Sequence, residues 1–278
     1  MFSVGPTFWS AIGNGNGNPA AGAAVLLHFD TSTQTGEGPV GGGYQARFHT
    51  TPNAANGATT CTIIGQNQVG NPFVTSDCEA AAAKFGPKGL RLNEYQTEGS
   101  FSCSRARIDV VSNMDVALGQ PFTLDFWHNK RSQNAYGTST TVYCVSVSAT
   151  PSGGPVWALT SGLYSGTAGQ HRYKFEGLAN SVETPSHVND SVYHNIRVTR
   201  DAANTLRIFF DGVLEGTAFS ATGALTAAGY FAVGSLGSGD TLIPNNYGSG
   251  DYDEVLWLPG VCLSTASYTP NTGPWLPP

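Results

Sequence analysis

The sequence predicts an all-β protein in which antiparallel strands form a β-sandwich. Three observations predict this fold class. Apolar and polar residues alternate strictly through residues 193–217 (YHNIRVTRDAANTLRIFFDGVLEGT), as expected for strands with one buried face. The 278-residue chain has 35 glycines and 16 prolines, which suits many short strands joined by turns. No long segment shows a helical period.

Residues 193–217 predict three consecutive antiparallel strands. Ile196 and Val198 share one face of the first strand, and Leu206 and Ile208 share one face of the second. The intervening RDAANT provides Asp, Asn and small residues, which favour turns. Asp211-Gly212 can adopt the positive φ angles of a two-residue hairpin, so residues 213–217 should fold straight back.

The other strands are expected at short intervals along the chain. Residues 77–86 contain an Ala run that is compatible with one or two helical turns. The expected strands lie in residues 23–30, 44–49, 60–65, 85–94, 106–111, 121–130, 140–149, 155–164, 171–177, 230–236 and 251–260.

The first 23 residues differ from the rest of the chain. They contain NGNGNP and AAGAA, which cannot build a core, together with Phe2, Phe8 and Trp9. We expect an extended N-terminal arm over residues 1–23 and one sandwich domain with a C-terminal tail over residues 24–278. The aromatic residues indicate that the arm docks, either on its own domain or on a neighbouring subunit.

The composition argues against several classes of protein. The net charge of −6 provides no basic patch for nucleic acid, and no run approaches the ~20 apolar residues of a membrane helix. The N-terminus lacks the basic region and apolar core of a secretory signal. Five cysteines without a CxxC spacing favour buried thiols over a disulfide framework or a zinc site, and Cys61 with Cys78 is the one pair to check.

The order of the predicted strands resembles the laminin-G-like jelly roll of the concanavalin A-like lectin/glucanase superfamily. The resemblance covers roughly residues 24–265. The matching stretches are VLLHFD at 25–30, KFGPKGLRL at 84–92, PFTLDFWHN at 121–129, YHNIRVTRDAANTLRIFFDGV at 193–213, FAVGS at 231–235 and GDYDEVLWLPG at 250–260.

This resemblance implies a two-sheet antiparallel jelly-roll sandwich. The family usually has Trp-His before the central strand, where this chain has Tyr193-His194. LLHFD followed by KFG is similar in style to versions of the domain in tailed-bacteriophage virion proteins. Fold alone does not determine function.

The residues do not predict an enzyme. Glucanases that the chain resembles carry E-x-D-x-x-E along one strand, and this pattern is absent. In DYDEVLW, Asp253 and Glu254 should point to opposite faces of the strand. H-E-x-x-H and G-x-S-x-G are also absent, and the six histidines are scattered along the sequence. We therefore expect no catalytic residues, no cofactor and no catalytic metal.

Asp125 and Trp127 are candidate carbohydrate-binding residues. In FTLDFWH, Phe122, Leu124 and Phe126 should face the core, so Asp125 and Trp127 share the opposite face. A sugar can stack on an aromatic ring and donate hydroxyl hydrogens to a carboxylate. The alternative, which we favour, is that loops or the N-terminal arm cover Trp127.

Residues 239–254 offer a weaker candidate site for calcium. Their oxygen-bearing side chains do not have an EF-hand spacing, and long turns contain the same residue types. The candidate ligands are Asp240, Asn245, Asn246, Asp251 and Asp253.

The leading functional prediction is a non-enzymatic structural protein of a tailed-phage virion, which decorates or cements the capsid. Its partners would be the major capsid protein or other virion subunits, contacted through Phe2, Phe8 and Trp9. It would assemble in the host cytoplasm as a homo-oligomer, with a trimer as the expected state. The alternative is an adhesin or tail-fibre module that binds host glycans.

Overall fold

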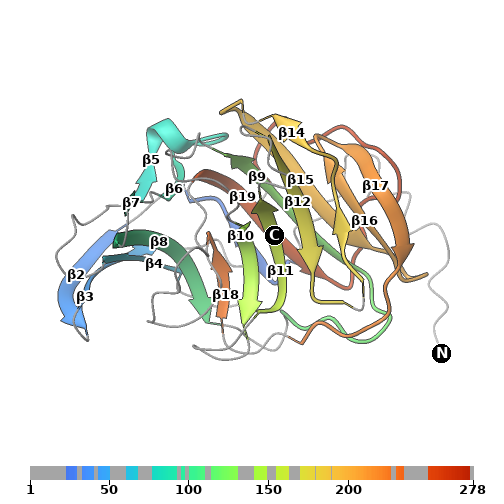
Figure 1. Cartoon of the computed structure of the whole chain (residues 1–278), viewed down its shortest axis with the longest axis horizontal. Coiled ribbons are helices and arrows are strands. Elements are labelled where there is room, and N and C mark those ends of the chain that lie inside the picture. Colours follow the sequence, from blue (N-terminus) through green and yellow to red (C-terminus); the bar gives the residue numbers. More distant parts are fainter. Residues whose placement is uncertain are drawn as a thin grey trace.

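In the computed structural model, the strands form two antiparallel sheets that pack face to face as a sandwich (Figure 1). The predicted all-β jelly-roll class is therefore confirmed. The structure describes residues 23–29, 33–40, 43–50, 61–67, 77–92, 95–97, 100–109, 114–130, 141–148, 155–162, 170–178, 180–188, 190–226, 230–234 and 250–275. The proposed docking residues Phe2, Phe8 and Trp9 lie outside these ranges.

The first sheet has the strand order β17-β16-β15-β9-β19-β6-β5, and β1 pairs with β19. Its strands are β1 (Val25–Leu27), β5 (Asp77–Glu79), β6 (Gly89–Leu92), β9 (Phe122–Asn129), β15 (Tyr193–Arg200), β16 (Thr205–Phe210), β17 (Val213–Ser220) and β19 (Gly250–Pro259).

The second sheet has the strand order β13-β12-β11-β10-β18-β8-β4-β3-β2, with β14 paired to β12 and β7 paired to β8. Its strands are β2 (Thr33–Val40), β3 (Gly43–Thr50), β4 (Cys61–Asn67), β7 (Tyr95–Thr97), β8 (Ser100–Asp109), β10 (Thr141–Ser148), β11 (Pro155–Gly162), β12 (Gln170–Glu176), β13 (Val182–Glu183), β14 (His187–Val188) and β18 (Tyr230–Val233).

The predicted hairpins of the central stretch are confirmed. Strand β15 pairs with β16, and β16 pairs with β17. Asp201 organises the first turn, where its Oδ1 accepts backbone N–H groups from Ala203 and Thr205, each at 2.9 Å. In the second turn, Asp211 and Gly212 have φ angles of 48° and 78°, as a tight two-residue hairpin requires.

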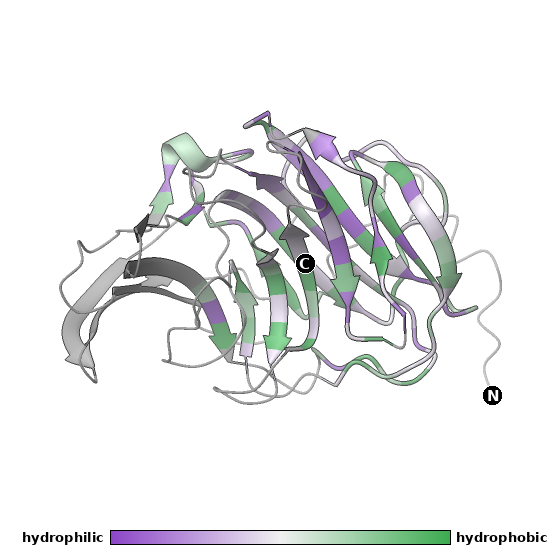
Figure 2. Ribbon diagram, viewed as in Figure 1, coloured by the Kyte–Doolittle hydropathy of each residue, from purple (hydrophilic) through white to green (hydrophobic). Residues whose placement is uncertain are grey.

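Aromatic side chains from both sheets meet in the main core. Trp157 of β11 stacks on Trp257 of β19 with ring centroids 4.7 Å apart, and Phe122 lies 5.3 Å from Trp257. The indole Nε1 of Trp257 donates to the carbonyl of Met114 at 2.9 Å, so this buried N–H is satisfied. Figure 2 shows the alternation of hydrophobic and hydrophilic residues along the strands that produces this buried interface.

Helical structure contributes little to the described part of the chain. The Ala run forms a single 3-10 turn, η2 (Ala80–Ala82). No described helix is both long enough and apolar enough to span a membrane. Cys78 and Cys144 are buried, as predicted for the cysteines, and Cys262 is half-buried. The side chain of Cys61, the other member of the pair to check, lies outside the described residues.

The C-terminal residues 261–275 pack across the outer face of the first sheet, on the side away from the main core. They complete a second, smaller apolar cluster. Its buried members are Ala23, Leu26, Leu256, Leu258 and Trp275, with Val261 and Leu263 packed against them. This cover determines which parts of the first sheet a ligand can reach.

Candidate functional site

Asp125 and Trp127 share the outer face of β9, as the alternation predicts. Phe122, Leu124 and Phe126 of the same strand belong to the main core. Across the sheet, Asp125 lies opposite Arg197 and Trp127 lies opposite Asn195 of β15, so these four side chains occupy one patch on the outer face.

Asp125 is engaged by protein groups and is only 1% exposed. Its carboxylate accepts a hydrogen bond from Arg197 Nε at 2.5 Å and another from Asn195 Nδ2 at 3.2 Å. The C-terminal segment closes over this pair, because Arg197 also donates to Ser264 Oγ at 2.7 Å and its guanidinium lies 3.8 Å from the ring centre of Tyr268.

Trp127 is covered by a different segment and is 7% exposed. Lys84 Nζ lies 4.3 Å from the centre of the Trp127 ring, and Phe85 contacts that ring edge-on at 5.5 Å. Asp253 Oδ2 holds this segment by accepting the backbone N–H groups of Lys84 and Phe85 at 2.8 and 2.9 Å. The favoured alternative, a covered Trp127, matches this arrangement. Carbohydrate binding by Asp125 and Trp127 stays a prediction that requires both covering segments to move.

Asp253 and Glu254 lie on the same face of β19, so the prediction of opposite faces was wrong. The cause is a β-bulge: the pairing with β9 shifts between Asp253 and Leu256, and Glu254 has a φ of 53°. Glu254 therefore reaches the outer cluster, where its Oε2 accepts the backbone N–H of Trp275 at 2.6 Å and its Oε1 contacts His28 Nδ1 at 2.6 Å.

The carboxylates of β19 serve structural contacts. Asp253 accepts three backbone N–H groups, and burial nevertheless raises its pKa to about 7. Asp251 is 1% exposed and accepts two hydrogen bonds from the Arg91 guanidinium, at 2.8 and 2.9 Å. These contacts leave neither group facing an open cleft.

Two of the five candidate calcium ligands lie in the described part of the chain. Asp251 and Asp253 have the contacts given above. Asp240, Asn245 and Asn246 lie outside the described residues. Within the described residues, no group of three or more His, Cys, Asp or Glu side chains is arranged to hold a metal ion.

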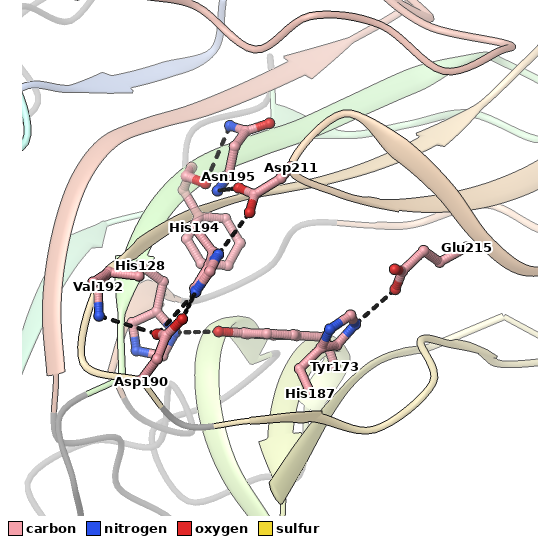
Figure 3. A network of polar contacts seen from close by, with 10 residues as sticks. His128, Tyr173, His187, Asp190, Val192, His194, Asn195, Asp211 and Glu215 are labelled. Carbon is pink, nitrogen blue, oxygen red and sulfur yellow. Dashed lines mark hydrogen bonds and ion pairs between the residues drawn. The ribbon is translucent and has the colours of Figure 1, made fainter.

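The fold gathers four histidines that are scattered in the sequence, namely His128, His171, His187 and His194. Figure 3 shows His128, His187 and His194 with their polar contacts. His128 and Tyr173 join the two sheets through a 2.9 Å contact between Nδ1 and the hydroxyl oxygen. His187 stacks on Phe210 with ring centroids 3.7 Å apart, while its Nε2 lies 2.7 Å from a carboxylate oxygen of Glu215. This contact links β14 of one sheet to β17 of the other.

The remaining two histidines of this cluster have opposite electrostatic environments. His171 is buried, and burial lowers its pKa to about 3. His194 is also partly buried, but hydrogen bonds to Asp211 and Asp190 outweigh that effect and raise its pKa. Sequence reasoning missed the cluster because no histidine pair is close in the chain. The register of β15 with β9, which only the structure shows, places His194 opposite His128.

An open cleft lies beside this cluster, at the edge of the sandwich where β13 and β17 approach each other. Its volume is about 370 Å³. This volume is at the lower end of the roughly 300–1,000 Å³ that small-molecule sites occupy. The cleft is lined by Arg172, Ser181, Val182, Glu183, Thr184, Pro185, Gly216, Thr217 and Phe219.

The lining combines one aromatic ring with hydroxyl groups and one ion pair. Phe219 packs partly against the main core and also lines the cleft. Arg172 and Glu183 form an ion pair with a 3.5 Å separation between NH1 and Oε1. Sequence analysis did not identify this site, because its lining combines residues of 172–185 with residues of 216–219, which are distant in the chain.

Two antiparallel sheets packed face to face define a jelly-roll sandwich. A model of the concanavalin A-like lectin/glucanases superfamily matches residues 106–264, which is more than half of the chain. The chain therefore belongs to this superfamily. A comparison with curated proteins gives no match.

Solved structures with a similar fold include botulinum neurotoxin domains. One is from botulinum neurotoxin type C, whose cell entry depends on interaction with two ganglioside molecules (TM-score 0.49, 8% identity, 88% of this chain and 50% of that chain). Another is the binding domain of botulinum neurotoxin DC in complex with rat synaptotagmin II (TM-score 0.46, 9% identity, 87% and 49%). This chain spans about half the length of these structures.

Proposed function

We propose that this domain binds carbohydrate, without hydrolysing it, in the cleft between β13 and β17. The observation that carries the proposal is the cleft itself: it is open, and its lining places Phe219 beside hydroxyl-bearing and charged side chains. The outer face around Asp125 and Trp127 is instead closed by the protein's own segments.

The chemistry of the lining suits a sugar. A pyranose ring has an apolar face, which packs on an aromatic side chain, and a rim of hydroxyl groups that both donate and accept hydrogen bonds. Phe219 offers the aromatic surface. Ser181 and Thr217 are exposed and offer hydroxyl groups, and Arg172 and Glu183 offer a charged donor and a charged acceptor.

The same lining argues against hydrolysis. Glycosidases generally place two carboxyl groups about 5–9.5 Å apart across the scissile bond. Glu183 is the one carboxylate among the described residues that line this cleft, and its charge is paired with Arg172. A second carboxylate is therefore missing from that set, and binding is the activity that the lining supports.

The experiment is a screen of the full chain against an array of neutral and acidic oligosaccharides, followed by calorimetry with each hit. Phe219→Ala should weaken binding about tenfold, because losing an aromatic contact costs about 1 kcal/mol or somewhat more. Leu118→Ala is the matched control, since Leu118 is an apolar side chain outside the cleft with 72% exposure. Equal affinities of these two variants, or no hit on the array, would refute the proposal.

The predicted virion role is a second candidate that rests on the sequence. Its contacts would come from Phe2, Phe8 and Trp9, which lie outside the described residues. Native sizing tests it: co-migration with very large particles, with residues 1–23 protected from protease, would support a cementing subunit assembled in the host cytoplasm. A free monomer with an exposed arm would refute both the capsid partners and the predicted trimer.

A further inference from the structure

The Arg172–Glu183 pair at the cleft is looser than a direct charge-assisted hydrogen bond. Its nitrogen and oxygen are 3.5 Å apart, whereas such bonds usually measure about 2.7–2.9 Å. Both side chains are partly exposed, with 29% and 40% of their surfaces accessible. Arg172 Nε donates to Ser186 Oγ at 2.9 Å, which orients the guanidinium at the cleft wall.

Glu183 is directed to Arg172 by the neighbouring charges. In the register of β12 and β13, Glu183 lies opposite Lys174. Lys174, however, forms a close ion pair with Glu176 on its own strand. Arg172 is therefore the cation whose ion pair with Glu183 borders the cleft.

This geometry suits two adjacent hydroxyl groups of a sugar. Arginine only donates hydrogen bonds and a carboxylate only accepts them, whereas each hydroxyl does both. A vicinal diol can accept from Arg172 through one oxygen and donate to Glu183 through the other. We propose that the cleft selects a neutral sugar whose vicinal hydroxyl pair bridges Arg172 and Glu183 while its ring packs on Phe219. This inference rests on the proposed carbohydrate-binding function.

The balance of charge in the cleft explains the preference for a neutral ligand. The other described lining residues are uncharged, so Arg172 and Glu183 compensate each other. An acidic sugar would be attracted to Arg172 but repelled by the adjacent Glu183, and an amino sugar would be attracted to Glu183 but repelled by Arg172, so a charge on the ligand gains little net attraction. Like charges at such short range oppose binding.

Gly216 allows β17 to approach the Glu183 segment closely enough to form the site. It has a φ of +68°, and a Cβ atom added there would lie 2.4 Å from the backbone oxygen of Glu183. The absence of a side chain permits this close approach, and Thr217 and Phe219 of the same strand line the cleft together with Arg172 and Glu183.

The test uses calorimetry of the full chain with the methyl glycoside of its best neutral monosaccharide, each monodeoxy derivative and the corresponding uronic acid. Removal of either hydroxyl of one adjacent pair should weaken binding at least tenfold, and the uronic acid should bind more weakly than the neutral glycoside. Glu183→Gln should also weaken binding at least tenfold. The matched control is Glu79→Gln, which removes a carboxylate that is also 40% exposed and paired with an arginine, Arg91, but lies outside the cleft lining.

The outcomes separate this inference from the proposed function. Sugar binding that is indifferent to Glu183→Gln and to every single deoxygenation would overturn the diol bridge while leaving carbohydrate binding intact. Tighter binding of the uronic acid would overturn the preference for neutral ligands. If the wild-type chain binds no sugar, both proposals fail. Thermal melting of each variant identifies any loss of affinity that comes from unfolding.

Discussion

Replacing Asp125 with alanine tests whether the outer face of the first sheet is a structural interface. The substitution removes the carboxylate that pairs with Arg197 at 2.5 Å, where the two side chains are 1% and 6% exposed. Breaking a buried ion pair leaves an uncompensated charge, which costs about 3–5 kcal/mol. We expect Asp125→Ala to lower the free energy of unfolding by about that amount.

Urea denaturation monitored by tryptophan fluorescence measures this loss. The double variant Asp125→Ala/Arg197→Met removes both charges, so it should recover most of the stability lost in the single variant. Glu79→Ala is the comparison for an exposed pair: Glu79 is 40% exposed beside Arg91, and its loss should stay within about 1 kcal/mol.

If Asp125 and Arg197 form a buried ion pair, Asp125→Ala must lower the free energy of unfolding much more than Glu79→Ala does. If Asp125→Ala costs less than about 1 kcal/mol, the same as Glu79→Ala, the pair with Arg197 is not a buried interaction in solution. The C-terminal segment 261–275 would then also be expected to leave the outer face. Limited proteolysis of that segment in the wild-type chain gives an independent reading.

Three further predictions concern pH, backbone geometry and packing. Burial lowers the pKa of His171 in the folded state to about 3, from 6.5 in the unfolded chain. The unfolded chain therefore binds a proton below pH 6.5 that the folded chain does not, so the folded state loses stability as the pH falls, by roughly 3 kcal/mol at pH 4. His171→Phe should therefore lose less stability than wild type in urea unfolding between pH 7 and pH 4, and equal losses would contradict this assignment. Gly216→Ala should lower the free energy of unfolding more than Gly260→Ala in the same assay. Both glycines have a positive φ, but a Cβ atom at Gly216 would clash with backbone, whereas nothing lies within 4 Å of the Cβ position at Gly260. Trp257→Ala should cost about 3–5 kcal/mol by calorimetric melting, because it empties the centre of the core, and a cost below about 1 kcal/mol would disprove its packing against Trp157.

The strands were predictable because alternation is a local property. Ile196 and Val198 face the core simply because they are two residues apart in an extended chain, and Asp211-Gly212 turns the chain because those residues tolerate positive φ. The bulge at Glu254 was not predictable from alternation. It adds one residue to β19 without a local marker, and it therefore reverses the face on which Glu254 lies.

The candidate site was less accessible to sequence reasoning than the fold. Asp125 and Trp127 were assigned to the correct face, but whether that face is open depends on Ser264, Tyr268 and Lys84, which are far from them in the chain. The cleft likewise needs Arg172 and Phe219 to meet across two different sheets. No spacing between such residues in the sequence reports their distance in space.

The sequence by itself determined that the protein is a β-sandwich, since side-chain alternation and turn chemistry act over a few neighbouring residues. Tertiary structure alone decided which surfaces remain open, where the histidines gather and which carboxylates are engaged. The physical reason is that these properties come from many weak contacts between distant segments, whose sum is settled only when the two sheets and the C-terminal segment pack together.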